Sequence, residues 1–134
     1  VAANHGVKGA GTAAPAFVSD ACNGWYHFDG GDTIALSVSG TKAAYAWWAR
    51  TGGLWHHYAM LGTTQYVDAV QQSFSNAFYV TAANTVTLGK NATTYLNGDM
   101  DEFRIYKAFT PADLTDLFNG TKDIFIERGS RVEF

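Results

Sequence analysis

The chain has 134 residues, which suits a single domain with one hydrophobic core. Apolar residues make up 47% and charged residues only 16%, below the roughly 25% usual for soluble domains, so extended disorder is excluded. The formal net charge is −3 and no stretch is rich in Lys or Arg, so we expect no binding of nucleic acid. Since no apolar stretch is long enough to span a bilayer, we also expect no membrane insertion.

Short apolar runs separated by turn signals dominate the chain from Trp25 onward. The first 24 residues are small and glycine-containing, and they predict a loop or an irregular arm. Strands about 8–12 residues apart are typical of an antiparallel sandwich or barrel. The expected strands cover residues 25–28, 33–38, 43–50, 54–61, 66–70, 74–80, 85–88 and 100–106.

One short helix is expected near the end of the chain. The segment Thr110-Pro-Ala-Asp supplies an N-cap, a proline at the first helical position and an acid at the third. An apolar stripe at helical spacing follows. Because Asn119-Gly120 is a helix stop signal, we predict a helix at residues 111–118 and strand character again at residues 123–134.

The segment from Asn97 to Tyr106, Asn-Gly-Asp-Met-Asp-Glu-Phe-Arg-Ile-Tyr, resembles the C-terminal signature of laminin-G-like (concanavalin-A-like) jelly-roll domains. The resemblance covers residues from about 4 to 120, although Ala69 stands where the family usually has glycine. It implies an all-β fold, a two-sheet antiparallel jelly-roll sandwich with one short helix at residues 111–118. The other matching pieces, in the order of the family, are Asn4-His5-Gly6, Phe28-Asp29-Gly30 with Asp32, Trp48 with Arg50, Trp55 with His57 and Ala59, and Tyr66-Val67-Asp68.

The buried side of the sandwich follows from strand alternation and from the resemblance together. Each expected strand contributes every second side chain to the core, and the helix contributes its apolar stripe. The residues expected in the core are Phe28, Ile34, Leu36, Trp48, Ala59, Phe103, Ile105, Leu114 and Leu117.

Trp47 and Trp48 are neighbours on one expected strand, so their side chains face opposite sides of the sheet. The resemblance implies that Trp48 lies in the core, which puts Trp47 on the other face together with Tyr45. Flat aromatic rings stack on sugar rings, so Tyr45, Trp47 and His56 form a candidate glycan platform. The alternative is that another layer or a neighbouring subunit covers Trp47.

Four acids lie in segments that resemble family positions near a structural calcium ion: Asp29, Asp32, Asp101 and Glu102. Ca²⁺ takes several carboxylate and carbonyl oxygens, so it is the candidate cofactor. The alternative is turn chemistry, in which Asp29 and Asp32 only accept hydrogen bonds from nearby backbone N–H groups.

Catalysis is not expected from the acids near the end of the chain. Glucanases of the same general fold place carboxylates at alternating strand positions, where they share a face. Asp99 and Asp101 share a face, but Glu102 points the other way, and Phe103 stands where the third acid would be. We therefore expect no enzymatic activity.

The function that we expect is a non-catalytic structural or adhesive module on an extracellular surface, such as a virion, fibre or filament. Its partners would be copies of itself, because low charge and high aromatic content imply apolar surface that must be covered. The alternative is a lectin-like domain that binds a cell-surface glycan. Domains of this kind serve both roles, so the fold does not decide between them.

The chain is expected to divide into a jelly-roll domain at residues 1–122 and a C-terminal strand at residues 123–134. The family normally has a strand before its Asn-His-Gly turn, so a sheet edge is expected to be vacant. We predict that the C-terminal strand fills this edge in its own domain or in a neighbouring copy. The alternative is that the family's first strand lies upstream of this sequence and that the tail is a linker. Its candidate assembly contacts are Ile124, Ile126, Val132 and Phe134.

Overall fold

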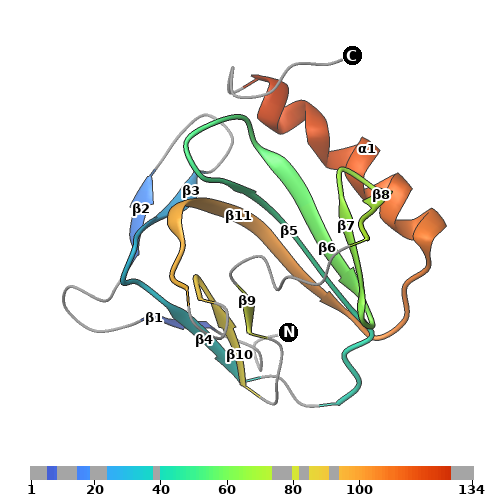
Figure 1. Ribbon diagram of the computed structural model, residues 1–134, viewed down its shortest axis with the longest axis horizontal. Coiled ribbons are helices and arrows are strands. Elements are labelled where there is room, and N and C mark those ends of the chain that lie inside the picture. The colour runs from blue at the N-terminus through green and yellow to red at the C-terminus, as the bar shows by residue number, and fades with distance from the viewer. Residues whose placement is uncertain are drawn as a thin grey trace.

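Two antiparallel sheets and one helix make up the part of the chain that the structure describes (Figure 1). The structure is a computed structural model. The described residues are 6–8, 15–18, 24–37, 40–73, 80–81, 85–90 and 94–127.

The smaller sheet has the strand order β1-β4-β10-β9, and every neighbouring pair in it is antiparallel. Ile34, Val86 and Leu88 turn from this sheet into the core, because alternate side chains of a strand face the same side. The strands of this sheet are β1 (Gly6–Lys8), β4 (Ile34–Ser37), β9 (Val80–Thr81) and β10 (Thr85–Leu88).

The larger sheet has the strand order β2-β3-β11-β5-β6-β7-β8 and is antiparallel throughout. One of its faces looks toward the smaller sheet, and the helix lies along the other (Figure 1). Its strands are β2 (Ala16–Val18), β3 (Trp25–Asp29), β5 (Ala44–Arg50), β6 (His56–Leu61), β7 (Thr64–Val67), β8 (Val70–Gln71) and β11 (Asn97–Tyr106).

The helix α1 (Pro111–Glu127) begins where the sequence predicts it. The backbone N–H of Thr110 donates to Asp113 Oδ2 at 2.8 Å, and the backbone N–H of Asp113 donates to Thr110 Oγ1 at 3.2 Å. These reciprocal bonds form a capping box, which satisfies two of the N–H groups that a helix start leaves without partners.

The helix does not end at Asn119-Gly120, so the strand predicted from residue 123 is wrong for residues 123–127. Phe125 extends the apolar stripe about two turns beyond Phe118 and is fully buried. This packing outweighs the weak local stop signal, because tertiary contacts supply most of the stability of a helix. Val132, Phe134 and the side chain of Ile126 lie outside the described residues, and Ile124 packs within its own chain beside Phe125.

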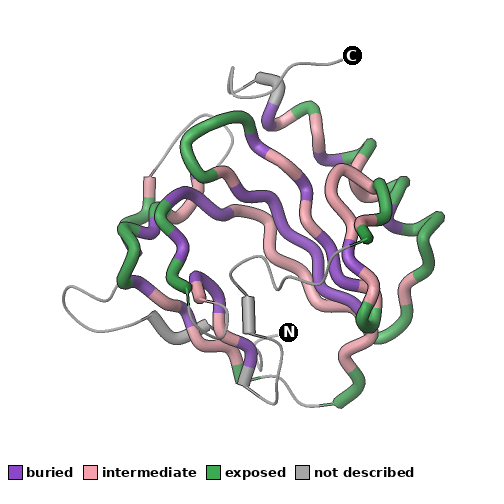
Figure 2. Tube along the Cα trace, in the orientation of Figure 1, coloured by how far each residue is buried: buried purple, intermediate pink, exposed green. Residues whose placement is uncertain are grey.

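Strand β5 is buried on both of its faces, as the purple tube in Figure 2 shows. Trp47 packs between the two sheets and Trp48 packs under α1, and both are 0% exposed. Tyr45 lies between the sheets with Trp47 and is 7% exposed. The prediction of a glycan platform on these rings is therefore wrong, because the smaller sheet covers them. Cover of Trp47 by another layer was the alternative expected from the sequence.

The remaining core predictions are confirmed in part. Phe28, Ile34, Trp48, Ala59 and Leu114 are buried. Half-buried side chains packed against the core are Leu36, Phe103, Ile105 and Leu117. An all-β sandwich of two sheets with one helix is thus confirmed, and within the described residues no helix has the length and apolar character needed to cross a membrane.

Candidate functional site

Three polar side chains from neighbouring strands line up at one end of the larger sheet. His27 of β3 and Arg50 of β5 both pair directly with Asp99 of β11. Residues directly opposite each other in antiparallel strands place their side chains on the same face. Since Arg50 alternates with Trp48 along β5, this is the face that carries α1.

The carboxylate of Asp99 is held from both sides. His27 Nδ1 lies 2.7 Å from Asp99 Oδ1, and Arg50 Nε donates to Asp99 Oδ2 at 2.6 Å. The Asp99 side chain is 11% exposed, whereas that of His27 is 47% exposed. Because a carboxylate only accepts hydrogen bonds, Nδ1 of His27 carries the proton, and Nε2 is the ring nitrogen left for an outside partner.

Arg50 is fixed by aromatic rings as well as by Asp99. Its guanidinium carbon lies 4.9 Å from the centroid of Trp55 and 5.4 Å from that of Trp25. The two indoles meet edge to face with their centroids 5.8 Å apart. Cation–π contacts of this kind hold the guanidinium over the rings, so Arg50 reaches Asp99 in a set orientation.

A close approach of two strands forms the floor of this site. A Cβ atom on Gly98 would lie 2.0 Å from the carbonyl oxygen of Arg50, so only glycine fits there. Above this contact the surface is hollowed by a recess of about 430 Å³, within the roughly 300–1,000 Å³ usual for small-molecule sites. The residues that line the recess are His27, Arg50, Thr51, Gly52, Gly53, Asn97, Gly98 and Asp99.

The recess offers the chemistry of hydroxyl recognition. It combines a fixed carboxylate, a guanidinium, an imidazole, the amide of Asn97 and the hydroxyl of Thr51. These groups donate and accept hydrogen bonds within one small volume. Such a surface suits an uncharged ligand with several hydroxyl groups.

The four acids expected to hold calcium fall into two separate pairs. Asp29 pairs with Asn97, and Asp101 lies four residues further along β11, about 13 Å away at a strand rise of about 3.3 Å per residue. Within the described parts of the chain, no three His, Cys, Asp or Glu side chains come together at one point. One calcium site made of Asp29, Asp32, Asp101 and Glu102 does not fit this geometry.

The turn between β3 and β4 shows the alternative chemistry. Asp32 Oδ2 accepts from the backbone N–H of Asp29 at 3.0 Å, and Asp29 Oδ1 accepts from that of Gly31 at 3.2 Å. Asp32 is only 2% exposed, and its Oδ1 has no hydrogen-bond partner among the described residues. A buried carboxylate oxygen of this kind is where a cation would bind, so calcium stays a prediction for this turn alone.

His56 does not line the recess, and Tyr58 is the aromatic neighbour that it shares with Trp47. Its Nδ1 is 2.8 Å from Asp68 Oδ2, and Asp68 Oδ1 accepts from the backbone N–H of His57 at 2.9 Å. Asp68 and Ala69 both adopt positive φ, 52° and 64°, in the tight turn that joins β7 to β8. A positive φ of this kind favours glycine, so Ala69 occupies a position that glycine adopts more easily.

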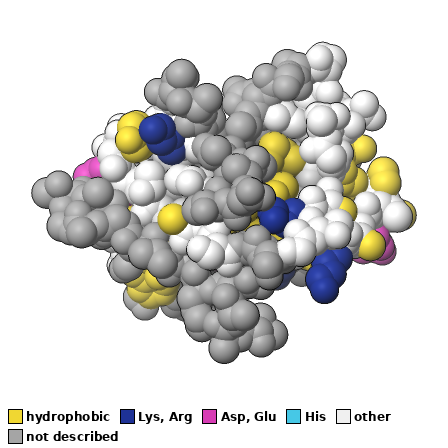
Figure 3. Space-filling view, turned by 90° about the horizontal axis from the view of Figure 1, so that it is seen from below, with side chains coloured by type: hydrophobic (Ala, Val, Ile, Leu, Met, Phe, Trp, Pro, Cys, Tyr) yellow, Lys and Arg dark blue, Asp and Glu magenta, His cyan; other side chains and the backbone are white. Residues whose placement is uncertain are grey.

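The charged side chains are dispersed over the face seen in Figure 3. The described Lys and Arg side chains on that face lie apart from one another among uncharged atoms. They therefore form no continuous basic surface within the described part of this face, which is the feature that a phosphate backbone requires.

Comparison with known protein families, curated proteins and solved structures found no match to this chain. No motif in the sequence marks His27, Arg50 or Asn97 as binding residues. The available signal was the alternation in β3, which places Trp25 and His27 on one face, but the partner strand was not known.

Proposed function

We propose that this chain is a non-catalytic, lectin-like domain that binds a sugar in the recess around Asp99. The observation that carries the proposal is the Asp99 carboxylate, which His27 and Arg50 hold in place at the wall of an open recess. Sugar hydroxyls both donate and accept hydrogen bonds, and they bind best to polar groups that need no reordering. Asp99 and Arg50 meet this condition.

The charge balance of the recess supports a neutral sugar. The positive charge of Arg50 faces the negative charge of Asp99 at 2.6 Å, so the pair has no net charge. A carboxylated or sulfated sugar would bring a second negative charge beside Asp99, where like charges repel. The proposed ligand class is therefore an uncharged sugar.

Assembly through Trp47 or Trp48 loses its support, because both rings are buried within the chain. The expectation of self-assembly rested on the low charge and the high aromatic content of the sequence, and Trp47 was one ring that a neighbouring subunit could have covered. The smaller sheet covers Trp47, and α1 covers Trp48. The sugar-binding alternative instead gains a polar recess that does not depend on those rings.

We also propose the jelly-roll form of the sandwich. Its support is that strands distant in the sequence are neighbours in both sheets. In the larger sheet β11 lies between β3 and β5, and in the smaller sheet β4 lies between β1 and β10. Crossing connections of this kind between two packed antiparallel sheets are typical of jelly rolls.

A glycan array is the direct test. We expect the wild-type chain to bind one group of neutral glycans and Asp99→Asn to lose that signal, because an amide cannot replace the charge-assisted bonds. The circular dichroism spectrum and the melting temperature of Asp99→Asn control for folding. Absence of binding to any glycan, or equal binding by a folded Asp99→Asn chain, would overturn the proposal.

A further inference from the structure

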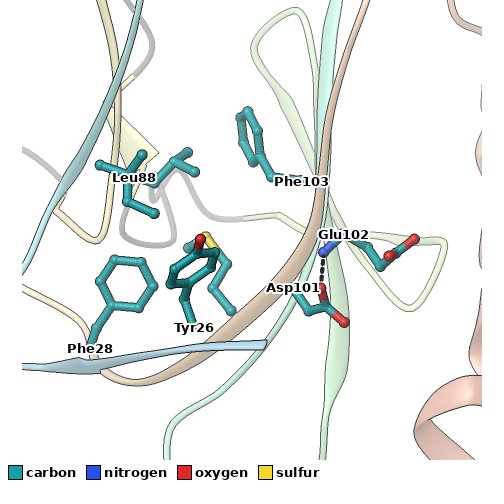
Figure 4. A pocket seen from close by; sticks show the side chains of 8 residues that line it. Tyr26, Phe28, Leu88, Asp101, Glu102 and Phe103 are labelled. Carbon is teal, nitrogen blue, oxygen red and sulfur yellow. Dashed lines mark hydrogen bonds between the residues drawn. The ribbon is translucent and has the colours of Figure 1, made fainter. Parts of the chain in front are cut away.

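A second cavity lies between the two sheets (Figure 4), on the face of β3 and β11 opposite to the polar recess. Its volume is about 170 Å³. Strands β3 and β11 form one wall and strands β4 and β10 form the other. The residues that line it are Tyr26, Phe28, Ile34, Leu88, Met100, Asp101, Glu102 and Phe103.

The interior of this inter-sheet cavity is apolar although two acids border it. Figure 4 shows Phe103, Tyr26 and Leu88 on one side of β11, whereas the side chains of Asp101 and Glu102 lie on the other side. Asp101 Oδ1 accepts from the backbone N–H of Glu102 at 2.8 Å. Glu102 Oε1 accepts from Arg104 Nη2 at 2.8 Å, so both carboxylates have partners outside the cavity.

A β-bulge in β11 produces this arrangement. The pairing of β11 with β5 shifts between Asp101 and Arg104, and Glu102 has a φ of 56°. The extra residue reverses the alternation of side chains, so Met100 and Phe103 both face the smaller sheet. A left-handed backbone at a residue other than glycine is strained, and strain of this kind gathers at binding sites.

The apolar surface continues from the cavity to the outside. Tyr26 and Phe103 are only half-buried. Phe17 pairs with Tyr26 across β2 and β3, meets its ring edge to face with the centroids 5.3 Å apart, and is 52% exposed. A ligand can therefore enter along apolar side chains.

The size and lining of the cavity select the ligand. A dry cavity of about 150 Å³ lined by apolar side chains holds one benzene molecule in another protein. Phe28, Phe103 and the Met100 sulfur offer the edge-to-face and sulfur contacts that aromatic rings prefer. We propose that this cavity is a second binding site, which takes an uncharged ligand with a single aromatic ring.

The two methionines of the chain provide a test with an internal control. Met100 lines the cavity, whereas Met60 lies in the same core without lining it. With ¹³C-methyl-labelled methionine, titration with benzene should shift the Met100 resonance in a saturable manner and leave that of Met60 in place. An unshifted Met100 resonance up to the solubility limit of benzene, or equal shifts of both resonances, would overturn the proposal.

Filling the cavity should abolish binding. Ile34→Phe places a ring in the site, and we expect benzene affinity to fall at least about tenfold. Leu36→Phe, on the same strand and face but outside the cavity lining, is the control and should bind as the wild type does. Benzene binding that survives in a folded Ile34→Phe chain would contradict the assignment.

Enlarging the cavity gives a second test, which does not depend on the folding of Ile34→Phe. Leu88→Ala removes three carbon atoms from the wall, so the cavity should then accept the two-ring ligand naphthalene more tightly than the wild-type chain does. Unchanged naphthalene affinity in a folded Leu88→Ala chain would count against the proposed site.

Discussion

The indole of Trp48 stacks on the ring of Phe125, with the ring centroids 4.2 Å apart and the planes 16° from parallel. Trp48 Nε1 also donates to Thr121 Oγ1 at 2.9 Å. Both partners lie in the half of α1 that follows Asn119-Gly120. These contacts pack the C-terminal half of α1 against the larger sheet. They explain why the helix continues past the stop signal at Asn119-Gly120.

Removing the Phe125 ring should therefore destabilise the fold. We expect Phe125→Ala to lower the free energy of unfolding by about 3–5 kcal/mol, because the ring is fully buried against Trp48 and Trp55. Asp123→Ala, an exposed change on the same helix, should have an effect within about 0.5 kcal/mol. Urea denaturation measures both values, and equal effects would show that this half of α1 does not hold the structure.

Gly98 and Gly53 both line the recess and form a matched pair. A Cβ on Gly98 would collide with the carbonyl oxygen of Arg50, whereas a Cβ on Gly53 would meet nothing within 4 Å. We expect Gly98→Ala to cost about 1–3 kcal/mol of stability, as overpacking usually does, and to weaken sugar binding. Gly53→Ala should leave the melting temperature nearly unchanged, and a similar loss in both variants would contradict the close approach at Gly98.

The phenol of Tyr45 should make the fold sensitive to alkali. Burial raises the pKa of Tyr45 above its ordinary value of 10.0. The folded chain then holds the phenol proton more tightly than the unfolded chain does, so stability is full below about pH 10 and falls as the pH rises further. Between pH 8 and pH 11, Tyr45→Phe should lose less unfolding free energy than the wild type, and parallel curves would disprove this role.

We expect calcium to act through the turn between β3 and β4. Asp32 Oδ1 is the buried oxygen without a hydrogen-bond partner in that turn. We expect Ca²⁺ to raise the melting temperature of the wild-type chain and excess chelator to reverse the rise, whereas Asp32→Asn should not respond. Identical melting curves with Ca²⁺ and with chelator would contradict the binding of calcium at this turn.

Local signals in the sequence identified most of the fold. Alternation indicated the central strands, and the Thr110-Pro-Ala-Asp segment indicated the start of α1, because the two residues of a capping box are only three positions apart in the chain. The end of α1 depends on contacts with Trp48 and Trp55, which are far away in the sequence. No local pattern contains that information.

The candidate site was less accessible from the sequence. Alternation separates Trp47 from Trp48 but does not tell which layer covers each face, and here both faces are covered. The recess joins His27 to Asp99, which lie 72 residues apart, and their meeting depends on the register between β3 and β11. Register is a property of paired strands, so it was not visible in either segment alone.

The central claim is that sugar binding depends on the recess, and two histidines allow the most direct test. His27 and His56 each contact an aspartate through Nδ1, at 2.7 Å and 2.8 Å, and their side chains are 47% and 41% exposed. Only His27 lines the recess among the residues that the structure describes.

The measurement is isothermal titration calorimetry of the His27→Ala and His56→Ala chains with the neutral glycan that binds the wild-type chain best. We predict that His27→Ala raises the Kd at least about tenfold, which corresponds to about 1.4 kcal/mol, while His56→Ala leaves it within about twofold of the wild-type value. Equal Kd values for the two variants would contradict the assignment of sugar binding to this recess.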